Sequence, residues 1–325
     1  MQMRKLVYRI RVLRHHLLIK PYMKTIAPWV LRVTKLLGFL HPAVVVKIDG
    51  GLGSQMWQYA LGRAVQLGSG LPVFYDISWF DKAGKDSNGI HSRCFELLNV
   101  FPHLPFEKVS TPRYCFYKLH CDFYPGLYDS YDKEMLSSQS SRYLGGYYVH
   151  QRYIDEQGDS LRKLYRFNLN LSEGNKEVFQ RITDCPLSVC VHVRRGDFVG
   201  SVFEVAGVEY YRSTIKLMSK KLAPQRPTFF IFSNGMAWAR EALKGLDEDI
   251  VFIEENGNDT GAYDMFLMSQ CAHFIICNSG FGWWAAWLSS REAQKIVLMP
   301  DRWLNSQDSM EQSVRKVDGW QEISV

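Results

Sequence analysis

Short apolar runs alternate with segments of helical length through the second half of the chain. Five runs of four to seven residues are predicted as buried strands: 187–193, 228–232, 250–253, 273–277 and 295–299. The segments between them are predicted as helices: 209–221, 237–246, 262–270 and 282–289. Strands that alternate with helices predict a parallel sheet with helices on both faces. This pattern restricts the fold to the α/β class.

The first half opens with the same kind of unit. Residues 43–48 are predicted as a buried strand that runs into the glycine loop Asp49–Gln55. A helix over 56–67 and a second strand over 71–75 follow. Residues 76–145 are rich in aromatic and loop-forming residues, and we expect this irregular region to contribute to the binding of an acceptor.

Length and charge divide the chain into three parts. A chain of 325 residues, 46% of them hydrophobic, favours two domains over one, and we place these at residues 41–170 and 171–325. Residues 1–40 contain nine Lys/Arg and no Asp/Glu, which leaves 30 basic and 33 acidic residues for the body. A net charge of −3 on the body argues against a nucleic-acid binder, because such a protein has its basic surface on the folded domain.

The basic segment 1–40 is predicted as an amphipathic helical extension. Its apolar residues recur at helical spacing in two sets: Leu6, Ile10, Leu13 and Leu17, then Trp29, Val33, Leu36 and Leu40. Two explanations stay open, namely helices that lie on an anionic membrane surface and a helical hairpin that packs on the body. The segment is too charged for a signal peptide, and no apolar run is long enough to predict a transmembrane helix.

The cysteines and carboxylates do not predict a metal site. None of the seven cysteines lies in a CxxC pair, and an odd, unpatterned set is typical of a reducing compartment. The acidic triplet Asp247–Asp249 precedes a predicted strand instead of following one, so it is expected to be a solvated turn. We therefore expect a cytoplasmic protein that requires no metal.

Charged side chains follow the first strand of the second series. Arg194, Arg195 and Asp197 come directly after residues 187–193. Ligands of open α/β sheets bind beyond the carboxyl ends of the strands, and a guanidinium fork suits phosphate oxygens. A structural ion pair at the end of a strand would explain the same residues equally well.

Other turns at strand ends have the composition of ligand-binding loops. Asn278, Ser279, Gly280 and Phe281 precede a predicted helix, whose first backbone N–H groups can bind an anion. Ser233 and Asn234 follow another strand, where a plain turn is the simpler explanation. The glycine loop lacks the lysine of a P-loop, so it is a weak nucleotide signature by itself. The tryptophans after Gly282 are predicted as core.

Taken together, these segments resemble the α-1,2-fucosyltransferases of glycosyltransferase family 11. The matching segments keep their order along the chain: Gly50–Ala60, Val191–Asp197, Tyr210-Tyr211, Phe232–Trp238, Asp264–Ser269 and Asn278–Leu288. Ser54 replaces a usual asparagine, and Gly280 and Gly282 replace two frequent serines. These departures remove side-chain donors and keep backbone donors.

The resemblance implies a GT-B fold, with two Rossmann-like domains that face a cleft. Residues 41–170 would bind the acceptor and residues 171–325 the GDP-sugar donor. It implies transfer of L-fucose from GDP-β-L-fucose to the 2-hydroxyl of a β-linked galactose, with inversion and without a cofactor. We expect a lipid-linked bacterial surface glycan, such as an O-antigen, at the inner face of the membrane.

The resemblance also implies that Arg194 would hold the donor phosphates. The proposed mechanism needs a base for the acceptor hydroxyl, and Asp197, His192 and Glu204 are the candidates. The predicted donor-binding residues are Arg194, Arg195, Ser233, Asn234, Asn278, Ser279, Gly280, Phe281, Gly50, Gly51, Gly53 and Gln55. A transferase for another GDP sugar and a non-catalytic glycan- or nucleotide-binding protein are the alternatives.

Overall fold

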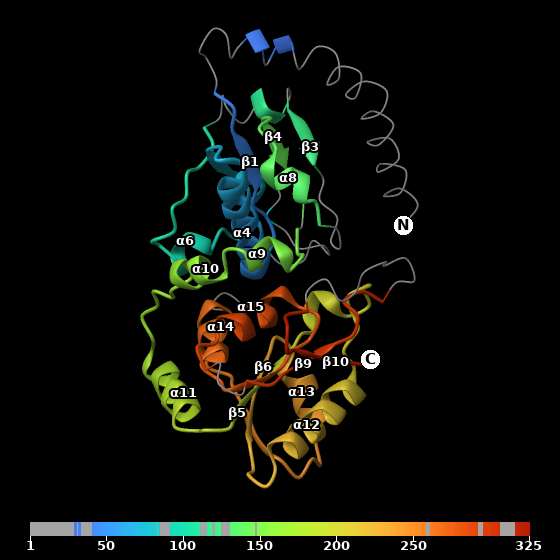
Figure 1. The fold of residues 1–325 in the computed structure, drawn as a ribbon. Helices are drawn as coiled ribbons and strands as arrows, with labels where there is room; N and C mark the ends of the chain where they lie inside the picture. Colours follow the sequence, from blue (N-terminus) through green and yellow to red (C-terminus); the bar gives the residue numbers. More distant parts are fainter. Residues whose placement is uncertain are drawn as a thin grey trace.

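The computed structural model describes residues 29–30, 32–33, 41–82, 84, 92–110, 116–118, 121–124, 131–146, 148–257, 261–291, 295–305 and 316–325. These residues form two α/β units, which lie one above the other in Figure 1. The predicted basic extension, residues 1–40, lies outside the described residues except at residues 29–30 and 32–33. None of the described helices is long and apolar enough to cross a membrane.

The first unit is built on a parallel sheet with the strand order β2-β1-β4-β3. Its strands are β1 (Val44–Lys47), β2 (Val73–Asp76), β3 (Asp122–Tyr124) and β4 (Arg142–Leu144). The long helix α4 (Leu52–Ser69) follows the glycine loop and contacts β1 and β2. Shorter helices complete this unit: α5 (Ser78–Lys82), α6 (Leu97–Val100) and α8 (Lys133–Ser137).

Two strands of this sheet lie in the region that the sequence predicts as irregular. β3 and β4 have three residues each, which is too short for a period-2 pattern to be recognised. β4 also begins with Arg142, a buried arginine whose Nη1 donates a hydrogen bond to the Met135 carbonyl at 2.6 Å. A charged residue inside a strand hides the apolar run that would have predicted it.

The second unit is a parallel sheet with the strand order β10-β9-β8-β5-β6-β7. Its strands are β5 (Ser188–Val193), β6 (Thr228–Ser233), β7 (Asp249–Phe252), β8 (His273–Ile275), β9 (Val297–Pro300) and β10 (Gln321–Ile323). Its helices are α12 (Val208–Leu222), α13 (Met236–Leu243), α14 (Gly261–Ser269) and α15 (Gly280–Leu288), with the 3₁₀ turn η2 (Gly196–Phe198) after β5. The predicted fold class, two Rossmann-like α/β units, is confirmed.

Helices α9 (Arg152–Asp155), α10 (Gly158–Leu164) and α11 (Glu173–Thr183) connect the two units. α9 contacts α4 in the first unit, and α11 contacts α14 in the second. The chain therefore passes from one unit to the other between α10 and α11, as the yellow-green trace in Figure 1 shows.

The two units meet through buried tryptophans on α4 and α15. The ring centroid of Trp57 lies 4.6 Å from that of Trp283 and 5.0 Å from that of Trp284. The indole N–H of Trp284 donates to the carbonyl of Gly53 at 3.0 Å. Large apolar side chains in mutual contact remove much surface from water, so this junction fixes the N-terminus of α4 against that of α15.

Candidate active site

A cavity of about 540 Å³ lies between the two units. The first unit lines it with the glycine loop and the start of α4. The second unit lines it with the segments that follow β5 and β6 and with the turn that precedes α15. The cavity therefore lies beyond the carboxyl ends of the second sheet, where open parallel sheets bind ligands.

Two helix N-termini converge at this cavity. Gly53 in the first turn of α4 lies so close to α15 that an added Cβ would be 2.8 Å from the backbone nitrogen of Phe281. Neither first turn contains Asp or Glu, and Gly51 at the start of α4 has no side chain to cap the helix. Because each N-terminus has a partial positive charge, their convergence favours a bound anion.

Arg194 adds a full positive charge to the same cavity. Its Nη2 donates to Asp197 Oδ1 at 2.6 Å, and its guanidinium lies 5.4 Å from the ring centroid of Phe198. Its Nε is buried and has no hydrogen-bond partner among the described residues. An arginine with an unpaired buried donor is suited to binding an anionic group such as a phosphate.

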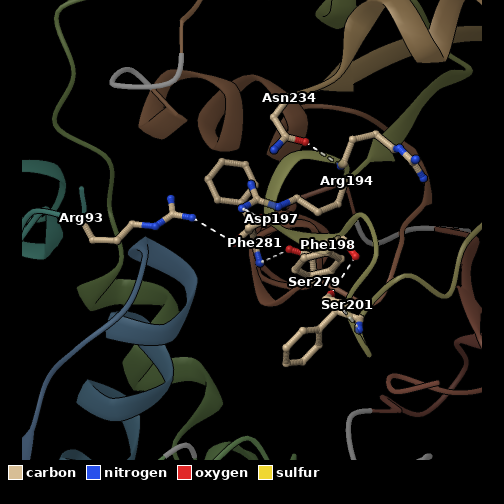
Figure 2. A network of polar contacts seen from close by, with 10 residues as sticks. Arg93, Arg194, Asp197, Phe198, Ser201, Asn234, Ser279 and Phe281 are labelled. Carbon is tan, nitrogen blue, oxygen red and sulfur yellow. Dashed lines mark hydrogen bonds and ion pairs between the residues drawn. The ribbon is translucent and has the colours of Figure 1, made fainter. Parts of the chain in front are cut away.

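A second arginine reaches Asp197 from the first unit. Figure 2 shows Arg93 pointing toward Asp197, and the Arg93 Nη2 lies 3.2 Å from Asp197 Oδ2. Asp197 therefore pairs with one arginine from each side of the cavity. No sequence pattern predicts Arg93, because it lies in the irregular region between α5 and α6.

His192 is a buried neutral side chain of the cavity wall. Burial, assisted by the charge of Arg194, lowers its pKa to about 3. Its Nδ1 lies 3.3 Å from Cys277 Sγ, and a Cβ on Gly282 would be 2.5 Å from that nitrogen. An imidazole with so low a pKa is a weak proton acceptor, which favours a hydrogen-bonding role over that of a general base.

Asp264 is a cavity residue to which the sequence assigns no role. Burial raises its pKa to about 6, although a hydrogen bond from Asn256 opposes this shift. Asn256 Nδ2 donates to Asp264 Oδ1 at 2.8 Å and to Asn175 Oδ1 at 2.9 Å. The sequence does contain a signal for Asp264, because this charged residue directly precedes the apolar run Met265–Met268 in α14.

Most of the predicted site residues line the cavity together. They are Gly50, Gly51, Gly53, His192, Arg194, Asp197, Ser233, Asn234, Asn278, Ser279, Gly280 and Phe281. The lining also includes residues that sequence reasoning missed: Trp79, Arg93, Glu96, Asn256, Asp264 and Trp303. Three of these residues, Trp79, Arg93 and Glu96, come from the first unit, whose fold brings them to the cavity.

Arg195, Gln55 and Glu204 do not line this cavity in the described part of the chain. The Arg195 guanidinium pairs with Glu204 at 2.9 Å and lies 4.4 Å from the Trp238 ring centroid. The N–H of Gly200 and, to a lesser degree, Arg195 lower the pKa of Glu204. Both strand-end arginines therefore form an ion pair, but Arg195 does so outside the cavity, whereas Arg194 pairs with Asp197 in the cavity lining.

Gln55 is wholly buried, and its side-chain amide forms hydrogen bonds with backbone groups. Its Nε2 donates to the carbonyls of Gly50 and Cys94 at 3.1 and 2.9 Å, and its Oε1 accepts the N–H groups of Glu96 and Leu97 at 3.0 and 3.1 Å. The structure thus places Gln55 behind the cavity wall, where it fixes the segment that contains Arg93.

The described residues contain no group of three His, Cys, Asp or Glu side chains that could hold a metal ion. The acidic triplet Asp247–Asp249 lies outside the cavity lining, and Asp247 pairs with the exposed Arg226. Its placement agrees with the solvated turn that the sequence predicts.

Known glycosyltransferases are similar to this chain in sequence. A sequence model described as glycosyl transferase family 11 matches residues 112–324. The chain is 29% identical to an α-1,2-colitosyltransferase of Escherichia coli, over 82% of this chain and 93% of that protein. It is 27% identical to the O-antigen biosynthesis glycosyltransferase WbnK of Escherichia coli, over 84% and 98%.

A shorter match joins the chain to an animal enzyme. It is 37% identical to the galactoside α-(1,2)-fucosyltransferase 2 of Oryctolagus cuniculus, over 31% of this chain and 29% of that protein. Among solved structures, NodZ α-1,6-fucosyltransferase soaked with GDP-fucose aligns at 16% identity over 77% of this chain and 93% of that chain, with a TM-score of 0.44. Because the family match covers well over half of the sequence, the chain belongs to glycosyltransferase family 11.

Proposed function

We propose that this glycosyltransferase moves L-fucose from GDP-β-L-fucose to the 2-hydroxyl of a β-linked galactose, with inversion at the anomeric carbon. The observation that most supports a nucleotide-diphosphate donor is the convergence in one cavity of Arg194 and two helix N-termini whose first turns contain no acidic residue. The names of two relatives include an α-1,2 linkage, which supports the proposed regiochemistry.

The donor diphosphate would lie between the helix N-termini and Arg194. As the bond between fucose and phosphate breaks, negative charge grows on the leaving diphosphate. We infer that the Arg194 guanidinium and the N-terminus of α15, where the Ser279 hydroxyl already accepts from the Phe281 N–H at 3.3 Å, stabilise that charge. We infer that these groups take the place of a cation at the diphosphate, so transfer is expected to proceed without added metal.

The guanine base has a complementary partner in the cavity. Its N1–H and 2-amino groups are hydrogen-bond donors, and a carboxylate accepts from both. Asp264 lines the cavity, and its Oδ1 accepts from Asn256, which restricts the orientation of the carboxylate. We therefore assign the base to the side of the cavity formed by Asp264.

The acceptor hydroxyl would attack the anomeric carbon from the face opposite the diphosphate, through an oxocarbenium-like state. The three predicted bases are all engaged or weak in this structure: both Asp197 oxygens pair with arginines, Glu204 pairs with Arg195, and His192 has a pKa of about 3. We infer that the hydroxyl proton passes to a solvent water molecule late, after most of the leaving-group charge has developed.

The test is incubation of the purified protein with GDP-fucose and a panel of β-galactosides, followed by linkage analysis of any product. We expect a product with fucose in α linkage to O2 of galactose, formed equally well in the presence of EDTA. Binding of GDP-fucose without transfer to any galactoside would instead favour the non-catalytic binding protein.

A second candidate donor is GDP-colitose. The support is the E. coli colitosyltransferase, which matches 82% of this chain. Colitose is L-fucose without the 3-hydroxyl, so the two donors differ at one hydrogen-bonding group. Competition between equal concentrations of the two donors separates the proposals, because a site built to bind the 3-hydroxyl discriminates strongly against its absence.

A further inference from the structure

Asp197 joins the two units of the enzyme through two arginines. Its Oδ1 accepts from Arg194 at 2.6 Å and its Oδ2 from Arg93 at 3.2 Å. Figure 2 shows Arg93 extending toward Asp197 from the first unit. The Asp197 side chain is 13% exposed and that of Arg93 is 27% exposed, so solvent screens this contact less than it screens a surface pair.

The segment that contains Arg93 is held firmly by α4. Gln55 binds it through three hydrogen bonds, one to the Cys94 carbonyl and two from the N–H groups of Glu96 and Leu97. Gln55 is itself wholly buried in the first unit. Arg93 is therefore presented to Asp197 from a fixed backbone, which lowers the entropy lost when the ion pair forms.

Because Asp197 pairs with two arginines, it neutralises only part of the positive charge of Arg194. A carboxylate paired only with Arg194 would neutralise the charge that the proposed diphosphate needs. With Arg93 sharing the carboxylate, the three groups have a net charge of +1. The second contact also restricts rotation of the Asp197 carboxylate, so the Arg194 guanidinium is held in one orientation.

We propose that Arg93 is a positioning residue of the transfer reaction, which acts from the first unit through Asp197 to orient Arg194 against the donor diphosphate. This inference rests on the proposed function of Arg194 as the phosphate-binding group. It also gives Gln55 a function in the site, as the residue that holds the Arg93 segment in place.

A double-mutant cycle with Arg93→Ala, Asp197→Ala and the double variant tests the proposal. Because misplacement of a catalytic group by about 1 Å can cost about 100-fold, we expect Arg93→Ala to lower kcat roughly 10- to 100-fold. The donor KM should change much less, and the double variant should be no slower than the slower single variant. Effects that multiply, or an unchanged kcat in Arg93→Ala, would overturn the proposal.

The conservative variant supplies a second readout. A lysine ammonium can pair with one carboxylate oxygen, so Arg93→Lys should recover most of the lost kcat if the role of Arg93 is to hold Asp197. An arginine that binds the phosphates directly with its fork would not be replaced by lysine. Failure of Arg93→Lys to recover activity in a folded protein therefore contradicts the positioning role.

Two controls make the outcome unambiguous. Arg226→Ala removes an exposed arginine paired with Asp247 and should leave kcat and KM unchanged. The affinity for GDP should be measured by calorimetry on the wild type, the two single variants and the double variant. The double variant should lose no more affinity than the weaker-binding single variant. A wild-type protein that binds GDP but does not transfer fucose would reject the proposed donor sugar, while the GDP cycle would still decide the role of Arg93.

Discussion

At the level of single residues, the chemistry depends on which groups in the cavity already have partners. Both oxygens of Asp197 are in ion pairs, His192 contacts Cys277, and Arg195 pairs with Glu204 outside the cavity. Arg194 keeps an unpaired buried Nε within the described part of the chain. A preorganised donor of this kind stabilises developing charge most effectively, since no reorganisation is needed when the charge appears.

Replacement of Arg194 tests this assignment. Arg194→Ala should lower kcat/KM at least about 100-fold, the loss typical of removing one donor to a developing anion. Arg194→Lys should recover little, because a lysine lacks the second N–H of the fork. Steady-state kinetics of both variants check this, with the exposed Arg240→Ala as the matched control. Near-normal turnover of Arg194→Ala would show that the leaving group is stabilised elsewhere.

The raised pKa of Asp264 predicts a pH dependence of donor binding. Because the folded-state pKa is about 6 against an ordinary value of 3.8, ionisation of Asp264 costs stability as the pH rises between these values. The guanine N–H groups prefer the carboxylate, so affinity for GDP-fucose should increase as the pH rises through about 6. His192 does not titrate in this range, since its pKa is about 3.

Calorimetric titration of GDP-fucose between pH 5 and pH 7.5 measures this dependence. GDP-fucose is preferable to GDP because its diphosphate has no second ionisation near pH 6. In Asp264→Asn the affinity should be lower above pH 6 and independent of pH. The exposed Asp247→Asn should keep the wild-type profile. A wild-type pH dependence that persists in Asp264→Asn would remove Asp264 from the base site.

At the level of elements, the site depends on the close approach of α4 and α15. Their N-termini approach only because Gly53 has no side chain, and Trp57, Trp283 and Trp284 hold the two helices together. Like partial charges at two helix N-termini repel each other. The packing of the tryptophans therefore maintains an arrangement that is electrostatically unfavourable until an anion binds.

A methyl group at Gly53 should separate the two helices. Its Cβ would lie 2.8 Å from the Phe281 nitrogen, a backbone atom that cannot move independently of α15. We expect Gly53→Ala to lower stability by about 1–3 kcal/mol, as is usual for overpacking, and to weaken GDP binding. Denaturant unfolding and calorimetry measure the two effects.

Gly207→Ala is the matched control, because a Cβ there meets no atom within 4 Å and Gly207 has a negative φ. Equal stability and GDP affinity in Gly53→Ala and Gly207→Ala would contradict the role of the close approach.

At the level of the whole molecule, charge is divided between the extension and the body. The nine Lys/Arg of residues 1–40 contrast with the net charge of −3 on residues 41–325. A basic amphipathic segment binds anionic bilayers through both apolar burial and electrostatic attraction. We propose that this segment places the enzyme on the inner face of the membrane, near a lipid-linked acceptor.

Co-sedimentation with liposomes tests this placement. The full chain should bind vesicles that contain anionic lipid, bind neutral vesicles weakly, and lose binding as the salt concentration rises. A variant in which glutamine replaces Arg4, Arg11 and Arg14 should bind less. Equal sedimentation of the full chain and of a variant that starts at His41 would favour the hairpin that packs on the body.

The sequence by itself determined the α/β class, the long strands and helices of the second unit, and 12 of the residues that line the cavity. Apolar periodicity and strand-end motifs are local properties, so they can be recognised without the fold. The same locality explains the strands that sequence reasoning missed: β3 and β4 have three residues each, and β10 has a polar sequence at the edge of its sheet.

Only the tertiary structure decided that Arg195 pairs outside the cavity and which residues of the first unit join Arg194 in its lining. Arg194 and Arg195 are equivalent in a strand-end pattern, and their separation depends on Glu204 and Trp238, which lie elsewhere in the chain. Arg93 and Asp197 are 104 positions apart and meet because the tryptophan junction brings the two units together. Contacts between distant segments depend on the packing of whole units, which no local pattern encodes.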